Sequence, residues 1–497
     1  MTFRIMLTLP VIAGISGSLS VIAQPPPRLP SPVHARGSAA RSAEMPPQPV
    51  QPDLARQAAY PSQPAHPGAF GDLSGPVPVE TLVQYALANN PAIQAARYRA
   101  RSLGARVPQA ASLPDPQLLT SVFLEQIQTA AGPQDVALSL SQRFPWFGKR
   151  ALRGQVAYHD ATAAYARVAG EELRVIEQAK LGYYDLYFVE SAIRETRRLQ
   201  LRLEDVVKIS QTKYETNVAG AGLESVLQAQ IELSKLKVTL VQLEQARTKA
   251  QARLAGTLHL PPQTRLEAVP RVERANVAHT AELLVQLAES CQPELDALRR
   301  EVSRDRSAID LASREYWPDV TVGFNWYEMG PGGISPVANG QDACSLGIGV
   351  NLPIYRKRLD AAVREAQYKT ASSRRRYAAT RDQVQSEIET LYAQFQEQQQ
   401  VLGILESEIL PRAEQGLGLT MESYRTGTRD FQQLIDTYRT LLDYRIDFHK
   451  RVAMREQAIA SLERAVGCAV TGGPTQRDAH PPGIPEAAPL PPPRPAP

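Results

Sequence analysis

The sequence contains little of what most enzymes and nucleic-acid-binding proteins use. Three of its 497 residues are cysteines, and their wide separation excludes a disulfide-dense scaffold and a C-x-x-C zinc site. Seven histidines occur singly, with no H-E-x-x-H pattern. The 55 basic and 51 acidic residues give a net charge of +4, too small to indicate a nucleic-acid partner. No nucleophile–base pair or phosphate-binding loop occurs at usable spacing, so we expect no enzyme, no cofactor and no metal site.

Long apolar runs are also scarce. The N-terminus has a basic start at Arg4, an apolar stretch and the small-residue end Val21-Ile22-Ala23, so residues 1–23 are expected to be a signal peptide. Beyond it, no run reaches the ~18 apolar residues that a transmembrane helix needs. We therefore expect an exported protein, in which any membrane crossing has to use β-strands.

Proline is rare in the middle of the chain and concentrated at its ends. Fourteen of the 40 prolines lie between Gln24 and Pro78, and ten follow Gly473. Such segments bury too little apolar surface to fold. The distribution predicts a disordered tether at 24–78 and a disordered tail at 469–497.

The body between these ends is duplicated. Four motifs recur in the same order, each displaced by about 202–210 residues: LVQYALANNP with LVQLAESCQP, SLPDPQL with YWPDVTV, FPWFGKR with LPIYRKR, and YETN with YRTG. The period is far longer than that of a solenoid. We expect two repeats, 79–262 and 282–468, joined by a linker at 263–281.

Each repeat carries two segments that alternate with period two, at about 117–125, 135–143, 319–327 and 345–352. The intervening segments, 126–134 and 328–343, are expected to be loops. Small or uncharged polar residues occupy one face of these strands, as in the lumen of a membrane barrel, although a soluble sheet alternates too. Four strands cannot close a channel, so several chains must contribute. The residues expected to face lipid are Val320, Val322, Phe324, Trp326, Leu346, Ile348 and Val350.

Helix-forming residues fill 150–217, which has no proline, and 358–426, which has one, Pro411; each stretch would span on the order of 100 Å as a helix. A third helix, expected over 223–254, has two apolar seams on nearly opposite sides. This pattern predicts a helix with one neighbour on each side, as in a cylinder one helix thick. The two seams are Leu233, Leu236, Leu240, Leu243, Ala250 and Leu254, and Leu227, Ile231, Ser234, Val238 and Val241.

These features together resemble the TolC-type outer-membrane efflux proteins, the outer-membrane components of tripartite efflux systems. The resemblance covers about 79–468 and is most specific in SLSQRFPWFGKRALRGQVA, from Ser139 to Ala157, where a strand leads into a helix. The residues at this strand–helix boundary are Phe144, Pro145, Trp146, Phe147 and Gly148, with Pro353 in the second repeat.

The resemblance implies a mainly α fold with a β-barrel part. Three copies would form a 12-stranded β-barrel in the outer membrane, continued by a 12-helix periplasmic α-barrel. It also implies docking to a periplasmic adaptor protein and an inner-membrane efflux pump, with no nucleic acid involved. Such a channel is a passive conduit. Its substrates would be metal cations, if the chain belongs to the heavy-metal branch of the family, or drugs. The alternatives are the conduit of a type I protein secretion system and a soluble periplasmic coiled-coil scaffold.

The resemblance also implies a gate at the periplasmic mouth. The family's gating tyrosine, arginine and aspartate fall on Tyr424, Arg429 and Asp436. A second aspartate of the family falls on Gln433, which leaves one acidic ring. The acidic partner expected near the first helix tip falls on Ser225, with Glu224 beside it. The alternative is that these are ordinary solvated charges at helix ends.

Overall fold

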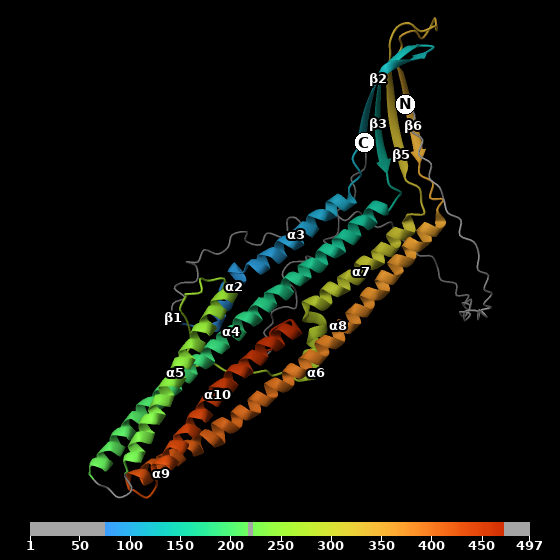
Figure 1. Ribbon diagram of the computed structural model, residues 1–497. Coiled ribbons are helices and arrows are strands. Elements are labelled where there is room, and N and C mark those ends of the chain that lie inside the picture. The colour runs from blue at the N-terminus through green and yellow to red at the C-terminus, as the bar shows by residue number, and fades with distance from the viewer. Residues whose placement is uncertain (1–74, 217–221, 472–497) are drawn as a thin grey trace, which may run out of the picture. The chain divides into compact units, whose positions relative to one another are not determined.

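A computed structural model describes residues 75–216 and 222–471 (Figure 1). The expected signal peptide, nearly all of the tether and tail, and the first helix tip at 217–221 lie outside the described residues. Within the described part, the order of elements repeats. The first repeat consists of α2 (Val79–Asn89), α3 (Pro91–Ala111), β2 (Gln117–Thr129), β3 (Gly132–Phe144), α4 (Lys149–Glu215) and α5 (Leu223–Leu258). The second consists of α6 (Ala281–Cys291), α7 (Pro293–Arg314), β5 (Val320–Met329), β6 (Ala343–Val350), α8 (Arg356–Ile404), η2 (Leu405–Ile409), α9 (Leu410–Arg425) and α10 (Phe431–Val466).

Each repeat opens with two consecutive helices separated by a single residue, and the break has the same cause in both repeats. Asn90 accepts a hydrogen bond from the backbone N–H of Ala92 at 2.8 Å, and Pro91 takes the first helical position of α3. In the second repeat, the Gln292 side chain accepts a hydrogen bond from the backbone N–H of Glu294, and Pro293 begins α7. Proline there removes no helical hydrogen bond and has the correct φ, so both sequences end one helix and start another.

The helix α4 is the central element of the chain. Its 67 residues contain no proline, and at 1.5 Å per residue they span about 100 Å. It packs against α3 and α7 toward its N-terminal end and against α5 and α10 further along. The largest apolar core includes Tyr183 and Leu186 of α4, Leu254 of α5 and Val452 of α10. Within the described residues, no helix is both long enough and apolar enough to span a bilayer.

The second long helix, predicted as a stretch over 358–426 with one proline, is interrupted beside that proline. The helix α8 ends at Ile404, a π-helical turn covers Leu405–Ile409, and α9 begins at Leu410. Pro411 explains the interruption, because its ring excludes an N–H donor and the usual hydrogen bond to the carbonyl four residues earlier. One wider turn accommodates this without ending the helical path.

The four long strands form one antiparallel sheet in the order β2-β3-β5-β6. Two short strands, β1 (Gly75–Val77) and β4 (Leu266–Ala268), pair in parallel elsewhere. The loop predicted at 126–134 is wrong, because β2 continues to Thr129 and β3 starts at Gly132. The extended hairpin is held by the 330–340 segment, where the N–H of Ser335 donates to the carbonyl of Ala130 at 2.9 Å.

Candidate functional site

The helix tips bring α4 and α9 together through Tyr424, one of the five predicted gate residues. Its side chain is buried, and its hydroxyl shares a hydrogen bond of 2.8 Å with the Ser210 hydroxyl of α4. The Lys213 ammonium of α4 lies 4.4 Å from the centre of the Tyr424 ring, and Phe431 packs edge-on at 6.0 Å. The tyrosine therefore attaches the second helix tip, which is the turn between α9 and α10, to α4 within one chain.

Arg429 and the predicted partners at the first tip remain apart among the described residues. The Arg429 guanidinium is exposed and donates to the Thr420 hydroxyl at 3.4 Å. Glu224 accepts from the Gln228 side chain of the same helix at 3.2 Å, and Ser225 is half-buried. The turn between α9 and α10 contains Gly427 at φ 78°, a conformation that favours glycine.

Asp436 belongs to a charge chain that the sequence analysis did not identify. Its carboxylate accepts from the Arg439 guanidinium at 3.1 Å and from Gln432 at 3.1 Å. Arg439 also pairs with Glu232, with Nε 3.1 Å from Oε2, and so links α10 to α5. Partial burial would raise the pKa of Glu232, but hydrogen bonds from Arg439 and Lys235 outweigh it and lower the pKa. The three-residue spacing of Asp436 and Arg439 was the available sequence signal.

The sheet gives its two faces different chemistry. Strand pairing sets Val320 opposite Val350, Val322 opposite Ile348, and Phe324 opposite Leu346. Directly paired residues point to the same side of a sheet, and Trp326 follows by alternation, so all seven predicted lipid-facing residues share one face. On the other face, the Ser139 hydroxyl donates to Oδ1 of the Asn325 side chain at 2.6 Å, and Nδ2 of the same side chain donates to the Ser345 hydroxyl at 3.3 Å.

The strand–helix boundary is a buried charge cluster. Lys149, the first residue of α4, is fully buried, and its ammonium lies 2.8 Å from Asp319 Oδ1, 2.9 Å from the Trp317 carbonyl and 3.3 Å from Glu315 Oε2. Asp319 is also buried and accepts from Arg143 Nε at 3.1 Å and from the Trp146 N–H at 3.0 Å. Each buried charge therefore has several partners, as low-dielectric surroundings require.

The predicted boundary residues surround this cluster in different ways. Trp146 stacks on Trp317 with ring centres 5.2 Å apart. Gly148 caps α4 at φ 84°, which lets the chain turn sharply from strand to helix. Burial would raise the pKa of Asp319, but hydrogen bonds from Lys149, Trp146 and Arg143 outweigh it and hold the pKa at about 2. Of the remaining boundary residues, Phe144 ends β3, Pro145 follows it, Phe147 is exposed and Pro353 is half-buried between β6 and α8.

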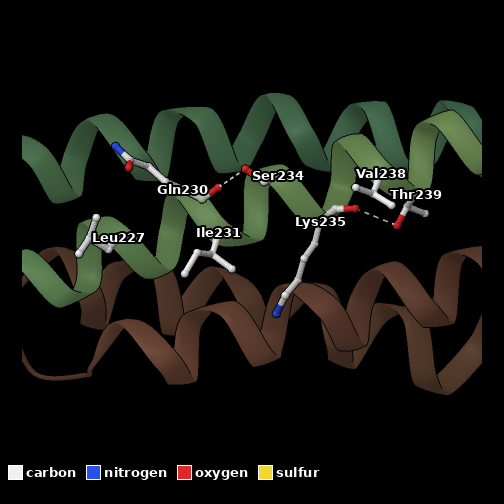
Figure 2. Close-up of a pocket in the computed structure, with 7 residues that line it drawn as sticks. All are labelled: Leu227, Gln230, Ile231, Ser234, Lys235, Val238 and Thr239. Atoms are coloured by element: carbon white, nitrogen blue, oxygen red, sulfur yellow. Dashed lines mark hydrogen bonds between the residues drawn. The ribbon is translucent and has the colours of Figure 1, made fainter.

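One seam of α5 is packed and the other is open. Leu233 and Leu236 pack against the core at the tips, and Leu254 is buried nearer the middle. In contrast, Leu227, Ile231 and Val238 line an open apolar groove on the surface of α5 (Figure 2). They are 50%, 54% and 58% exposed, respectively. The described residues contain no cluster of three or more His, Cys, Asp or Glu side chains suited to a metal ion.

Comparison with known proteins gives a consistent result. Residues 284–468 match the family model described as outer membrane efflux protein. Over 410 residues the chain is 21% identical to the cobalt-zinc-cadmium resistance protein CzcC of Cupriavidus metallidurans, covering 80% of this chain and 91% of that protein. The outer membrane protein VceC of Vibrio cholerae has the same fold, with a TM-score of 0.65 at 19% identity over 79% of this chain and 96% of VceC. The CmeC outer membrane channel of Campylobacter jejuni gives 0.61 at 14% over 89% and 94%.

The duplicated order of broken helix, strand pair and long helices thus occurs in a chain whose fold is similar to that of outer-membrane channels. The comparisons place residues 284–468 in the outer membrane efflux protein family, and the chain has the fold of solved outer-membrane channels.

Proposed function

We propose that this chain is the outer-membrane channel of a tripartite efflux system, with a long periplasmic extension. Three copies close a 12-stranded β-barrel in the outer membrane and continue it as a 12-helix tunnel. A periplasmic adaptor connects the tunnel to an inner-membrane pump, which supplies the energy. The repeats 79–262 and 282–468 contribute quasi-equivalent halves of each copy.

The observation that carries this proposal is that a single copy leaves both edges of its sheet and one apolar face of a helix uncovered. In the sheet, β2 and β6 each have one unpaired side. In the helical part, the groove along Leu227, Ile231 and Val238 is exposed on α5. Unpaired edge strands and exposed apolar side chains along a helix are surfaces that partners commonly cover. Joining β6 of each copy to β2 of the next covers both edges of the sheet, and a head-to-tail contact of this kind gives a ring when its rotation closes.

The lumen and the substrate are the second part of the proposal. The face with Ser139, Asn325 and Ser345 lines the barrel, whereas the face with Phe324 and Ile348 meets lipid. Divalent heavy-metal cations are the proposed substrates, because the likeness to the cobalt-zinc-cadmium resistance protein extends over most of both chains.

The helix tips are the proposed closable mouth, with Tyr424, Arg429 and Asp436 from the second tip and Glu224 and Ser225 from the first. Their support is the position of Tyr424 against α4 and the link from Arg439 to Glu232 on α5. Exposed charge pairs hold such a mouth weakly enough to open.

The deciding experiment is isolation of the full-length chain from the outer membrane in detergent. Native mass spectrometry should give three copies, and planar bilayers should show discrete conductance steps. Disruption of the gene should sensitise the host to cobalt, zinc and cadmium salts. A monomer in the soluble periplasmic fraction would instead indicate a scaffold. A trimer whose loss sensitises the host only to drugs, or blocks secretion of a protein, would replace the metal substrate and retain the channel.

A further inference from the structure

The internal repeat maps the buried charge cluster onto a second site. The cluster joins Asp319, just before β5, to Lys149, just after β3. The motif SLPDPQL aligns with YWPDVTV and places Asp115 on Asp319, while FPWFGKR aligns with LPIYRKR and places Lys357 on Lys149. Asp115 therefore precedes the edge strand β2, and Lys357 follows the opposite edge strand β6.

Unlike their counterparts, these two residues are exposed. Lys149 and Asp319 are 0% and 2% exposed, whereas Lys357 and Asp115 both lie on the surface. Among the described residues, neither side chain has an ion pair or a hydrogen bond. The apolar neighbours repeat the contrast. Trp146 stacks on Trp317, but their counterparts Ile354 and Leu113 are 67% and 36% exposed.

Strand register provides an independent check. In the sheet, Gln142 pairs with Val322, and Leu138 pairs with Trp326. Replacing each residue by its counterpart in the other repeat maps β3 onto β6 and β5 onto β2. The resulting pairs are Val350 opposite Leu118 and Leu346 opposite Val122, between β6 of one copy and β2 of the next. A slip of one residue would put these side chains on opposite faces.

The faces already fixed within one chain agree with this register. Leu118 shares a face with its partner Leu140, which shares one with Phe324. Val350 shares that face through Val320. Leu118 and Val350 therefore both lie on the apolar face. This assignment comes from pairing within one chain and is independent of the repeat alignment that gave the register between copies.

We propose that Lys357 of each copy forms an ion pair with Asp115 of the next copy, between paired strands β6 and β2. The proposal rests on the ring of three copies proposed above and specifies its contact. The second version has fewer partners than the first, because Arg143 is replaced by Asn351 and Glu315 by Ala111. Contacts between copies should therefore be weaker than the cluster within each copy.

Charge reversal tests the pair. Lys357→Asp and Asp115→Lys should each lower the temperature at which the purified full-length trimer dissociates in SDS, because each places like charges together. The double variant should recover most of the loss. Arg358→Asp, with the same charge change one residue away, is the matched control and should give no recovery when combined with Asp115→Lys.

Cysteine cross-linking tests the register. In a background with Cys291, Cys344 and Cys468 changed to serine, Leu118→Cys with Val350→Cys should yield dimers and trimers with a short thiol-specific cross-linker. Leu119→Cys with Val350→Cys should not, since Leu119 lies on the other face. An intact trimer with neither charge recovery nor the 118–350 cross-link would overturn this inference and leave the channel proposal standing. A wild-type chain that never forms a trimer would overturn both.

Discussion

The two ends of α4 handle charge in opposite ways. At its start, Lys149 is fully buried and contacts acceptors from Glu315, Trp317 and Asp319. At its far end, the charges of Arg429 and Asp436 lie on the surface, and their contacts are single hydrogen bonds or pairs three to four residues apart. One helix thus joins a densely bonded end to a lightly bonded one.

The difference follows from desolvation. A buried charge that loses its partner is left uncompensated at a cost of several kcal/mol, so such a cluster has one arrangement. Exposed pairs contribute at most ~1 kcal/mol, and water replaces them readily. We therefore expect the strand–helix boundary to stay fixed when the helix tips move.

The largest effect is expected from Lys149→Met. The change removes the ammonium but keeps the length of the side chain, which leaves Asp319 with Arg143 and the Trp146 N–H alone. We expect a loss of about 3 kcal/mol in stability, at the lower end of the range for a broken buried pair. Thermal unfolding followed by circular dichroism measures it. Lys237→Met, on an exposed face of α5, is the control, and equal unfolding temperatures for the two variants would refute a rigid boundary.

The sheet should show the next largest effect. Ile348→Arg places a charge on the apolar face, whereas Gly347→Ser adds a small polar group to the other face. An arginine near the bilayer midplane costs ~2–4 kcal/mol, so the first variant should assemble poorly and the second normally. The yield of heat-modifiable trimer in the outer-membrane fraction is the measurement. Equal yields would contradict the assignment of the faces.

Acid should act on the boundary through Asp319. Its pKa in the fold, about 2, lies below the usual 3.8, so the carboxylate contributes stability above pH ~4 that is lost as the pH falls toward 2. The contribution is about 2 kcal/mol. Unfolding temperatures of the wild type and Asp319→Asn should therefore converge on acidification. A difference that is the same at pH 6 and pH 2.5 would show that the aspartate acts by shape rather than charge.

Much of the fold could be predicted from the sequence because local patterns determine it. Period-two alternation located the four strands, and the repeated motifs showed the duplication that the order of elements displays. The hairpin extension beyond Glu125 could not be predicted, because a distant segment at 330–340 holds it. The π-turn before Pro411 was missed for a different reason, since a proline only marks a break and tertiary packing decides whether the helical path continues.

The site was harder to predict than the fold. Tyr424 was selected by resemblance, but its contacts Ser210 and Lys213 lie more than 200 residues away in the chain. Lys149 and Asp319 stood inside two motifs used to find the repeat, yet nothing local indicates that the motifs meet. Pairing of β3 with β5 brings them together. Register is a long-range property, and the contacts that depend on it are too.

The smallest change in stability and the most specific change in function are expected at the tips. Arg429→Ser and Arg439→Ser each remove exposed hydrogen bonds, and the second also releases α10 from Glu232 on α5. Each should cost less than ~1 kcal/mol, so the trimer should stay intact. If these contacts hold the mouth closed, single-channel conductance in planar bilayers should rise, more for Arg439→Ser because it connects two helices.

Ion selectivity separates the acidic ring from the latch. Three copies of Asp436 around the mouth would attract cations, but Arg439 partly neutralises each carboxylate at 3.1 Å. Asp436→Ala should therefore weaken cation preference, and Arg439→Ser should strengthen it. The effects of the two changes should not be additive, because Arg439 pairs with both Asp436 and Glu232. Arg412→Ser, an exposed arginine of α9 away from the tips, is the control and should change neither conductance nor selectivity. Selectivity that ignores Asp436 and conductance that ignores both tip arginines would mean that these are solvated helix-end charges and that the mouth lies elsewhere.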